Sequence, residues 1–436
     1  MPSATTPSIG IDFGTTNTVI AVNDGEGASR VIRFPTPDGR SAAAFRSVLS
    51  FRERAPGERT GEIEAGPWAI EAFLDDPQDT RLIQSFKSFA ASAAFAGTSI
   101  FGKRFQFEDL LHTYLRRLLI RGVGALPHRP ARTVVGRPVV FAGADPDEAL
   151  ALARYRAAFS RLDLPAVSFA YEPIGAAVYF ARRVQGSAVV LVADFGGGTS
   201  DFSIMRFHTV GGRIQAEPLS RSGVGVAGDA FDYRIIDHVI SPRLGKGTDY
   251  RSGDKRLPVP ARYYSAFARW NQLALMKWSR DMREIREIAR TADDQEGFAR
   301  LIELLEDDYG YRLYRAVSGV KEALSAAPGA VLDFQAGAIR IQAEVSRADF
   351  EGWIAGELRS IERALDEALA KAGIVAGQVD KVFLTGGSSF VPAVRAIFED
   401  RFARDAIETG GEFESIASGL AHIGADPDAD VLSAAG

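Results

Sequence analysis

The chain has 436 residues, of which 46% are hydrophobic and 25% charged, the usual balance of a globular protein with a buried core. Its formal net charge of -5 argues against a protein that binds nucleic acid through a strongly basic domain. The absence of cysteine excludes disulfides, thiolate metal sites and cysteine nucleophiles. No secretory signal or membrane-length apolar run is evident, so we expect a cytoplasmic protein that does not bind membranes.

Short apolar segments next to glycine predict buried strands at 9–13, 19–22, 133–135, 189–194, 202–206 and 382–384. Glycine-rich turns follow the strands near Gly14, Gly196 and Gly386. Helical periodicity covers 108–121, 147–162, 262–305 and 345–372, with Gly373 as a helix stop, whereas 241–260 has the composition of a loop. This order predicts an α/β protein with two related lobes rather than one dinucleotide-binding unit.

The segment IGIDFGTTN at 9–17 joins two predicted strands through Gly14, Thr15, Thr16 and Asn17. Glycine allows backbone N–H groups to approach a phosphate, and threonine hydroxyls add donors. Asp12 ends the first strand, where a carboxylate can hold Mg²⁺ through water. A hairpin with a turn carboxylate is the alternative interpretation of this segment alone.

A second segment, VLVADFGGGTSD at 190–201, repeats the same arrangement. Asp194 ends the strand, and the turn contains Gly196, Gly197, Gly198 and Thr199. Two such turns in one chain favour a paired phosphate and Mg²⁺ site over two unrelated hairpins.

These segments resemble the two phosphate motifs of the actin-like ATPase superfamily, in the wording found in the ATPase domain of the 70-kilodalton heat-shock chaperones. FLTGGSSFVP at 383–392 is similar to the adenosine loop of that family, and YEPIGAA at 171–177 to its connecting motif. The matches run from Ile9 to about His422 in the expected order. VGRPVV at 135–140 and the chain length are similar to a bacterial branch called YegD-like.

The resemblance implies a bilobal, ribonuclease H-like α/β fold. Lobe I would cover 1–187, with a core of 1–40 and 131–187 and a smaller subdomain of about 41–130. Lobe II would cover 188–411, with a core of 188–228 and about 350–411 and a smaller subdomain of about 229–349. Residues 412–436 would return to lobe I. The chain ends about 14 residues after His422, so we expect no peptide-binding domain.

The resemblance also implies roles for individual residues around the phosphates. Asp12 and Asp194 would hold the water shell of Mg²⁺, and the two glycine-threonine turns would bind the phosphates. Glu172 falls on the family's glutamate near the attacking water. Lys87, in QSFKSFA at 84–90, is the best counterpart of the family's catalytic lysine, with a solvated surface lysine as the alternative.

On the nucleoside side the match is weaker. Residues that fit the family pattern are Gly228, Asp229, Lys321, Ser325, Gly386, Gly387 and Ser388. Asp229 as the cap of a helix and Lys321 as a helix-surface charge are the alternatives. A family glutamate falls on Ser318, and two family arginines fall on Glu322 and Phe390, so base selectivity is left open. Phe390 could still stack on a base.

These implications favour a slow Mg²⁺-dependent ATPase that binds ATP and ADP and has a chaperone-like or switch role. A nucleotide-sensing module without turnover and a sugar-type kinase on the same fold are the alternatives. The sequence identifies no client protein or co-chaperone.

Overall fold

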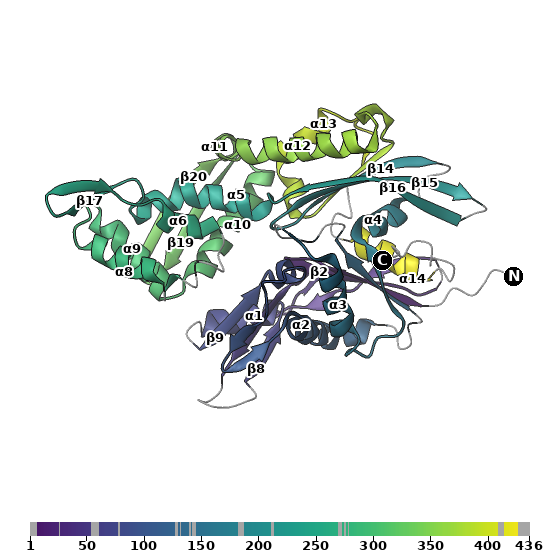
Figure 1. Cartoon of the computed structure of the whole chain (residues 1–436), viewed down its shortest axis with the longest axis horizontal. Helices are drawn as coiled ribbons and strands as arrows, with labels where there is room; N and C mark the ends of the chain where they lie inside the picture. The colour runs from purple at the N-terminus through teal and green to yellow at the C-terminus, as the bar shows by residue number, and fades with distance from the viewer. Residues whose placement is uncertain are drawn as a thin grey trace. The chain divides into compact units, whose positions relative to one another are not determined.

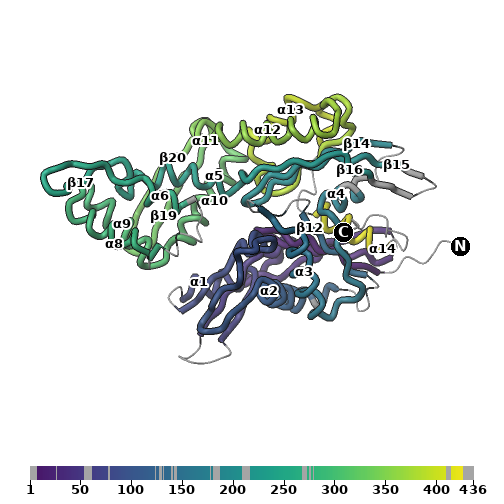
Figure 2. The backbone as a smooth tube through the Cα atoms, viewed as in Figure 1, coloured from purple at the N-terminus to yellow at the C-terminus, as the bar shows by residue number. Residues whose placement is uncertain are grey.

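A computed structural model gives the structure of the chain. It describes residues 7–25, 27–53, 61–76, 79–126, 130, 132–138, 141, 145–181, 187–210, 213–268, 273, 276–277, 279–408 and 414–425. The described residues form two compact units. Unit 1 lies within Met1–Gly225, Arg363–Gly387 and Phe398–Gly436, and unit 2 comprises Val226–Glu362 and Ser388–Ile397. The chain leaves unit 1 after strand β16 and returns to it through helix α12, a path that can be followed in Figure 2.

The first large sheet of unit 1 has the order β13-β12-β1-β2-β3, with β6 also paired to β2. Its strands are β1 (Ser8–Phe13), β2 (Asn17–Asn23), β3 (Ser29–Val31), β6 (Phe45–Arg46), β12 (Arg132–Arg137) and β13 (Val167–Tyr171). Strand β1 is antiparallel to β2 and parallel to β12. The buried, mostly apolar residues of β1 and β2 explain why this hairpin occupies the centre of the sheet.

The second large sheet repeats this topology in the order β16-β15-β14-β21-β22. Its strands are β14 (Ala188–Phe195), β15 (Ser200–Val210), β16 (Arg213–Val224), β21 (Lys381–Thr385) and β22 (Ile407–Glu408). Strand β14 is antiparallel to β15 and parallel to β21, as β1 is to β2 and β12. The expected α/β fold with two related sheets is confirmed by this repetition. The boundaries proposed for the lobes and their subdomains stay a prediction.

Helices α4 (Glu172–Ala181) and α14 (Ser415–Ala425) pack against each other next to these sheets (Figure 1). One hydrophobic cluster joins Ile174 of α4 and Leu420 of α14 to Val134 of the first sheet and Val192 of the second. The two helices therefore connect the cores of both sheets, and Glu172 begins α4 at this junction.

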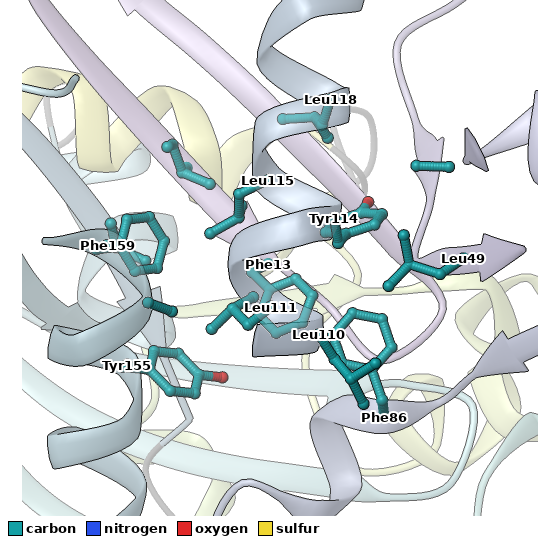
Figure 3. Packing of buried hydrophobic residues seen from close by; sticks show 14 of the residues in the cluster. Phe13, Leu49, Phe86, Leu110, Leu111, Tyr114, Leu115, Leu118, Tyr155 and Phe159 are labelled. Atoms are coloured by element: carbon teal, nitrogen blue, oxygen red, sulfur yellow. The ribbon is translucent and has the colours of Figure 1, made fainter. Parts of the chain in front are cut away.

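A second core surrounds helix α2 (Phe107–Gly122). Leu111, Tyr114 and Leu115 of α2 lie around Phe13 at the end of β1, and Tyr155 and Phe159 of helix α3 (Glu148–Phe159) lie on one side of this group (Figure 3). Three smaller sheets also belong to unit 1: β8 (Glu62–Ala65), β7 (Val48–Arg52) and β9 (Thr80–Gln84); β4 (Phe34–Pro35) with β5 (Ser41–Ala42); and β10 (Thr98–Ile100) with β11 (Lys103–Phe105). Its other helical elements in this part of the chain are α1 (Pro67–Asp75), η1 (Phe86–Phe89) and η2 (Val123–Ala125).

Unit 2 combines helices with two hairpins, β17 (Asp249–Ser252) with β18 (Lys255–Pro258) and β19 (Gly329–Ala336) with β20 (Ile339–Ser346). The helical elements are α5 (Gly228–Ile235), η3 (Ile236–Ile240), η4 (Ser241–Leu244), α6 (Arg262–Ser265), η5 (Ala266–Ala268), α8 (Arg280–Ala289), α9 (Gln295–Glu306), α10 (Gly310–Ala326), α11 (Arg347–Trp353), the first part of α12 (Ala355–Ala372) and most of α13 (Pro392–Glu399). The turn η6 (Ala376–Gln378) belongs to unit 1, and η7 (Gly387–Phe390) crosses the boundary.

Three local predictions are wrong within unit 2. The helix expected at 262–305 is interrupted, because Ser279 and Asp294 accept hydrogen bonds from the backbone of the following residues and start α8 and α9. The region 241–260 is not a loop but contains η4 and a hairpin that turns at Gly253. The helix expected from 345 begins only after Ser346, which ends β20 and caps α11. The end of the chain after 425 lies outside the described residues.

None of the helices in the described ranges is both long and apolar enough to cross a membrane.

Candidate functional site

Two glycine turns in unit 1 have the same local geometry. The backbone N–H of Gly14 donates to the carbonyl of Asn17 at 2.9 Å, and that of Gly196 donates to the carbonyl of Thr199 at 3.0 Å. A Cβ atom on Gly14 would lie 2.4 Å from the Asn17 carbonyl oxygen, so the first turn requires glycine. Around Gly198 the added Cβ would meet nothing within 4 Å. Both turns can therefore present backbone donors to an anion.

Each turn follows a strand that ends near a carboxylate. Asp12 lies opposite Val19 in the first hairpin, and Asp194 lies opposite Asp201 in the second. The hydroxyl of Thr385, on neighbouring strand β21, donates to Asp194 at 2.7 Å. The hydroxyl of Thr199 donates to Asp201 at 2.8 Å. These bonds fix the two carboxylates of the second hairpin.

Lys87 and Glu172 form a buried ion pair, although 85 residues separate them. The ammonium of Lys87 donates to Oε1 of Glu172 at 2.8 Å, and the two side chains are 10% and 9% exposed. Lys87 lies on η1, which follows the left-handed backbone of Ser85 (φ 53°). Its ammonium also lies 5.7 Å from the ring centroid of Phe13. The structure therefore brings Lys87 to the end of β1, and the alternative of a solvated surface lysine is wrong.

The carboxylates around Lys87 carry more negative charge than its ammonium offsets. Burial raises the pKa of Asp12 well above its ordinary value, Glu172 and Asp194 raise it further, and Lys87 opposes the shift. Burial also raises the pKa of Glu172, which Lys87 partly offsets. For Lys87 burial acts to lower the pKa, but Glu172, Tyr155 and Asp12 together raise it above the usual range. Glu172 and Asp12 thus both act on the ammonium of Lys87, and Asp194 adds further negative charge to the two carboxylates, so an added cation would be favourable here.

The carboxylates of Asp12 and Asp194 fit a Mg²⁺ ion that is bound through water. Carboxylate oxygens are ligands that this hard cation prefers, and it commonly keeps several waters. Within the described part of the chain, no three His, Cys, Asp or Glu side chains gather closely enough to hold one ion together. Asp12 and Asp194, acting through water and together with phosphate oxygens, are consistent with both observations.

The other predicted phosphate residues lie in the same two turns. Thr15, Thr16 and Asn17 are half-buried, and the carbonyl of Thr16 accepts a hydrogen bond from the backbone of Ser47 at 2.9 Å. Gly197 and Thr199 are half-buried and Gly198 is exposed. All of them belong to unit 1, as do Asp12, Lys87, Glu172 and Asp194.

The predicted nucleoside residues divide between the units. Gly386 and Gly387 belong to unit 1, and a Cβ atom on Gly386 (φ 81°) would lie 2.1 Å from the Phe195 carbonyl oxygen. Ser388 and Phe390 belong to unit 2, where Ser388 is buried and Phe390 is 44% exposed. The glycines thus bring β21 close to β14, and their contact with a nucleoside stays a prediction.

In unit 2, Lys321 of α10 is engaged with the start of α5. Its ammonium lies 2.9 Å from Oδ1 of Asp232 and donates to the carbonyl of Gly228 at 3.2 Å. Ser325 donates to the carbonyl of Lys321 at 3.2 Å. The N-cap residue of α5 is Ala227, and Asp229 lies in the first turn of the helix. Lys321 is too enclosed for a plain surface charge.

Sequence reasoning missed two residues that contact the site. Thr385 lies in the FLTGGSSFVP segment, and its hydroxyl at the end of a predicted strand was a usable signal. Arg137 is 3% exposed, donates to Glu148 and lies 4.4 Å from the ring centroid of Tyr171, directly before Glu172. An arginine between an apolar strand and a proline was the available signal for this buried cation.

Comparison with known proteins shows similarity to Hsp70 and DnaK proteins. A family model described as Hsp70 protein matches residues 297–433. The chaperone protein DnaK of Deinococcus deserti is 24% identical over 426 residues, which are 95% of this chain and 58% of that protein. A DnaK of Thermus thermophilus is 22% identical over 427 residues, 95% of this chain and 60% of that protein. The Hsp70 model therefore covers only the C-terminal part of the chain, whereas the similarity to the DnaK proteins covers 95% of it and about three fifths of those relatives.

Proposed function

We propose that this chain binds ATP together with Mg²⁺ and slowly hydrolyses it to ADP and phosphate. The observation that carries the proposal is the presence, in one unit, of two matched glycine turns, two strand-end carboxylates and the buried Lys87–Glu172 pair. The similarity to chaperone proteins DnaK supports the same activity.

In this proposal each group of the protein has a separate task. The backbone N–H groups of the two turns bind phosphate oxygens, and Asp12 and Asp194 hold the water shell of Mg²⁺, which neutralises phosphate charge when bound. Lys87 stabilises the charge that develops on the transferred phosphoryl group. Glu172 orients the water that attacks the γ-phosphorus while the bond to the ADP oxygen breaks. Thr385 keeps Asp194 in place through its hydrogen bond.

A phosphate-release assay tests this proposal directly. We expect Lys87→Ala and Asp194→Asn to lower the rate by at least about 100-fold, because each removes preorganised charge stabilisation. Lys371→Ala is the matched control, because Lys371 is 53% exposed and pairs with Glu367 on the surface of α12. ATP binding without turnover in the unaltered protein would contradict the ATPase proposal.

The nucleoside specificity requires a separate measurement. Calorimetric titration with ATP, GTP and ADP, each with and without Mg²⁺, separates phosphate recognition from base recognition. We expect strong dependence on Mg²⁺, since Glu172 and Asp194 both act on the buried carboxyl of Asp12, where Lys87 is the cation that opposes them. Equal affinity for ATP and GTP would indicate that Ser318, Glu322 and Phe390 do not discriminate between bases.

A nucleotide-sensing module without turnover is the second candidate. The observation that favours it is the closed Lys87–Glu172 pair, because a lysine that never leaves the carboxylate cannot reach a phosphate. A kinase is distinguished by phosphate transfer that requires an added small alcohol. A chaperone-like role, with a client or co-chaperone, follows only from the names of the relatives and is part of the proposal.

A further inference from the structure

Tyr155 is a buried tyrosine of unit 1 to which the ATPase proposal assigns no task. Its side chain has no exposed surface and lies among aromatic rings. The ring centroids of Phe13, Phe107, Phe141 and Phe169 are 6.1, 6.0, 5.9 and 6.0 Å from its own. Within the described residues, its hydroxyl has no hydrogen-bond partner.

An unpaired buried hydroxyl is unfavourable for folding. Removing a polar group from water without a new hydrogen bond costs free energy, and an apolar group of the same shape would avoid that cost. A phenylalanine at position 155 would make the same aromatic contacts with α2 and β1. Packing alone therefore does not explain the hydroxyl.

Tyr155 shares a neighbour with the Lys87–Glu172 pair and interacts with both of its charges. The ring centroid of Tyr155 lies 6.1 Å from that of Phe13, and the ammonium of Lys87 lies 5.7 Å from the same centroid. Figure 3 shows the Tyr155 ring beside Phe13, with its oxygen pointing away from the ribbon of α3. Burial raises the pKa of Tyr155, Lys87 lowers it, and Glu172 and Asp12 raise it. The hydroxyl therefore stays protonated at neutral pH and can donate a hydrogen bond.

The role proposed for Lys87 requires a second hydrogen-bond donor to Glu172. Lys87 donates to Glu172 in the structure, and it must release that carboxylate to reach a phosphate. A buried carboxylate that loses its partner is strongly destabilised. A second donor next to the pair would stabilise Glu172 in that state.

We propose that Tyr155 is a positioning residue for hydrolysis, whose hydroxyl donates to Glu172 when Lys87 turns to the phosphate and so keeps this carboxylate oriented toward the attacking water. This inference rests on the proposed ATPase function. It also explains why a hydroxyl that weakens the core is present at this position.

The test compares Tyr155→Phe with Tyr114→Phe. Tyr114 is buried in the same cluster, but its hydroxyl donates to the carbonyl of Phe45 at 3.3 Å. The full chain is used for melting without nucleotide, for titration with Mg²⁺ and ATP, and for hydrolysis in a single turnover. Tyr155→Phe is also made in a Glu172→Gln background.

We expect Tyr155→Phe to melt at or above the wild-type temperature and to bind ATP within about twofold of wild type, while its single-turnover rate falls about tenfold. Tyr114→Phe should melt at a lower temperature and hydrolyse within about twofold of wild type. In the Glu172→Gln background, Tyr155→Phe should change the rate by less than about twofold, because it acts through Glu172.

The other possible results contradict either the role of Tyr155 or the ATPase proposal. A wild-type rate in Tyr155→Phe overturns the inference and leaves the ATPase proposal intact. A melting temperature below that of Tyr114→Phe, a tenfold loss of ATP affinity, or a full additional loss in the Glu172→Gln background would assign the hydroxyl a structural or binding role instead. Absence of turnover in the wild type would contradict both proposals and is recognised before any variant is measured.

Discussion

The ion pair of Lys87 and Glu172 places two opposite charges in an enclosed position of unit 1. Such a pair contributes little net stability while it is intact, because both charges have lost water. Removing one partner, however, leaves the other buried without compensation. The pair can therefore be tested through stability as well as through activity.

Lys87→Met should lower the free energy of unfolding by about 3 kcal/mol, because Glu172 then remains as a buried, unpaired carboxylate. Adding Glu172→Gln should recover most of this loss without restoring hydrolysis, since both charged groups of the proposed mechanism are then absent. Urea unfolding at neutral pH measures both effects. Equal stability of wild type and Lys87→Met would show that the pair is not closed in solution.

Asp232, the partner of Lys321, predicts a pH effect in unit 2. Burial raises its pKa from 3.8 to about 6, against the opposing effect of Lys321. The folded state thus binds more protons than the unfolded state between these values, and its stability falls as the pH rises through them. Between pH 4 and pH 6 this contribution falls by about 2 kcal/mol.

Asp232→Asn should remove that contribution. From pH 4 to pH 6, the unfolding free energy of the variant should therefore fall less, or rise more, than that of the wild type. Denaturant unfolding at the two pH values measures it. Asp333→Asn, on the exposed side of β19, is the control and should keep the wild-type pH dependence. An unchanged pH dependence in Asp232→Asn would contradict the raised pKa.

At the scale of elements, helices α4 and α14 approach each other through glycine. A Cβ atom on Gly419 of α14 would lie 1.7 Å from the carbonyl oxygen of Gly175 in α4. Since α4 begins at Glu172, this close packing also sets the position of the predicted catalytic carboxylate. The packing of the two helices is therefore part of the site.

Gly419→Ala should lower the free energy of unfolding by about 3 kcal/mol or more, because the clash is with backbone and cannot be relieved by a side-chain rotation. Gly352→Ala in α11 is the matched control, since nothing lies within 4 Å of its added Cβ. The control should be stabilised by roughly 0.5–1 kcal/mol, as expected for alanine in place of helical glycine. A Gly419→Ala protein as stable as this control would refute the proposed close approach.

Strands and helices could be predicted where the sequence pattern that indicates them lies within a single element. Apolar runs followed by glycine predicted β1, β14 and β21, and helical periodicity predicted α2 and α3, because each pattern lies within one element. The interruptions at Ser279 and Asp294 were missed, since single capping bonds decide them. The lack of a partner for the Tyr155 hydroxyl among the described residues could not be predicted either, because it depends on packing between segments far apart in the chain.

At the scale of the whole molecule, unit 1 contains both phosphate turns and the residues proposed for hydrolysis. Ligand binding to this unit should stabilise the folded chain by mass action. At 100 times the dissociation constant, ATP with Mg²⁺ should add about 2.7 kcal/mol to the free energy of unfolding. Asp194→Asn should lose most of this gain when melting is followed with and without ATP and Mg²⁺, and an equal gain in the variant would argue against Asp194 as a cation-holding residue.

The most direct test of the ATPase proposal is phosphate release from ATP by the full chain in the presence of Mg²⁺, compared with Lys87→Ala. We predict slow release by the wild type that exceeds the rate of Lys87→Ala by at least about 100-fold. Equal release by the two proteins, or none by the wild type while ATP is bound, would contradict the account.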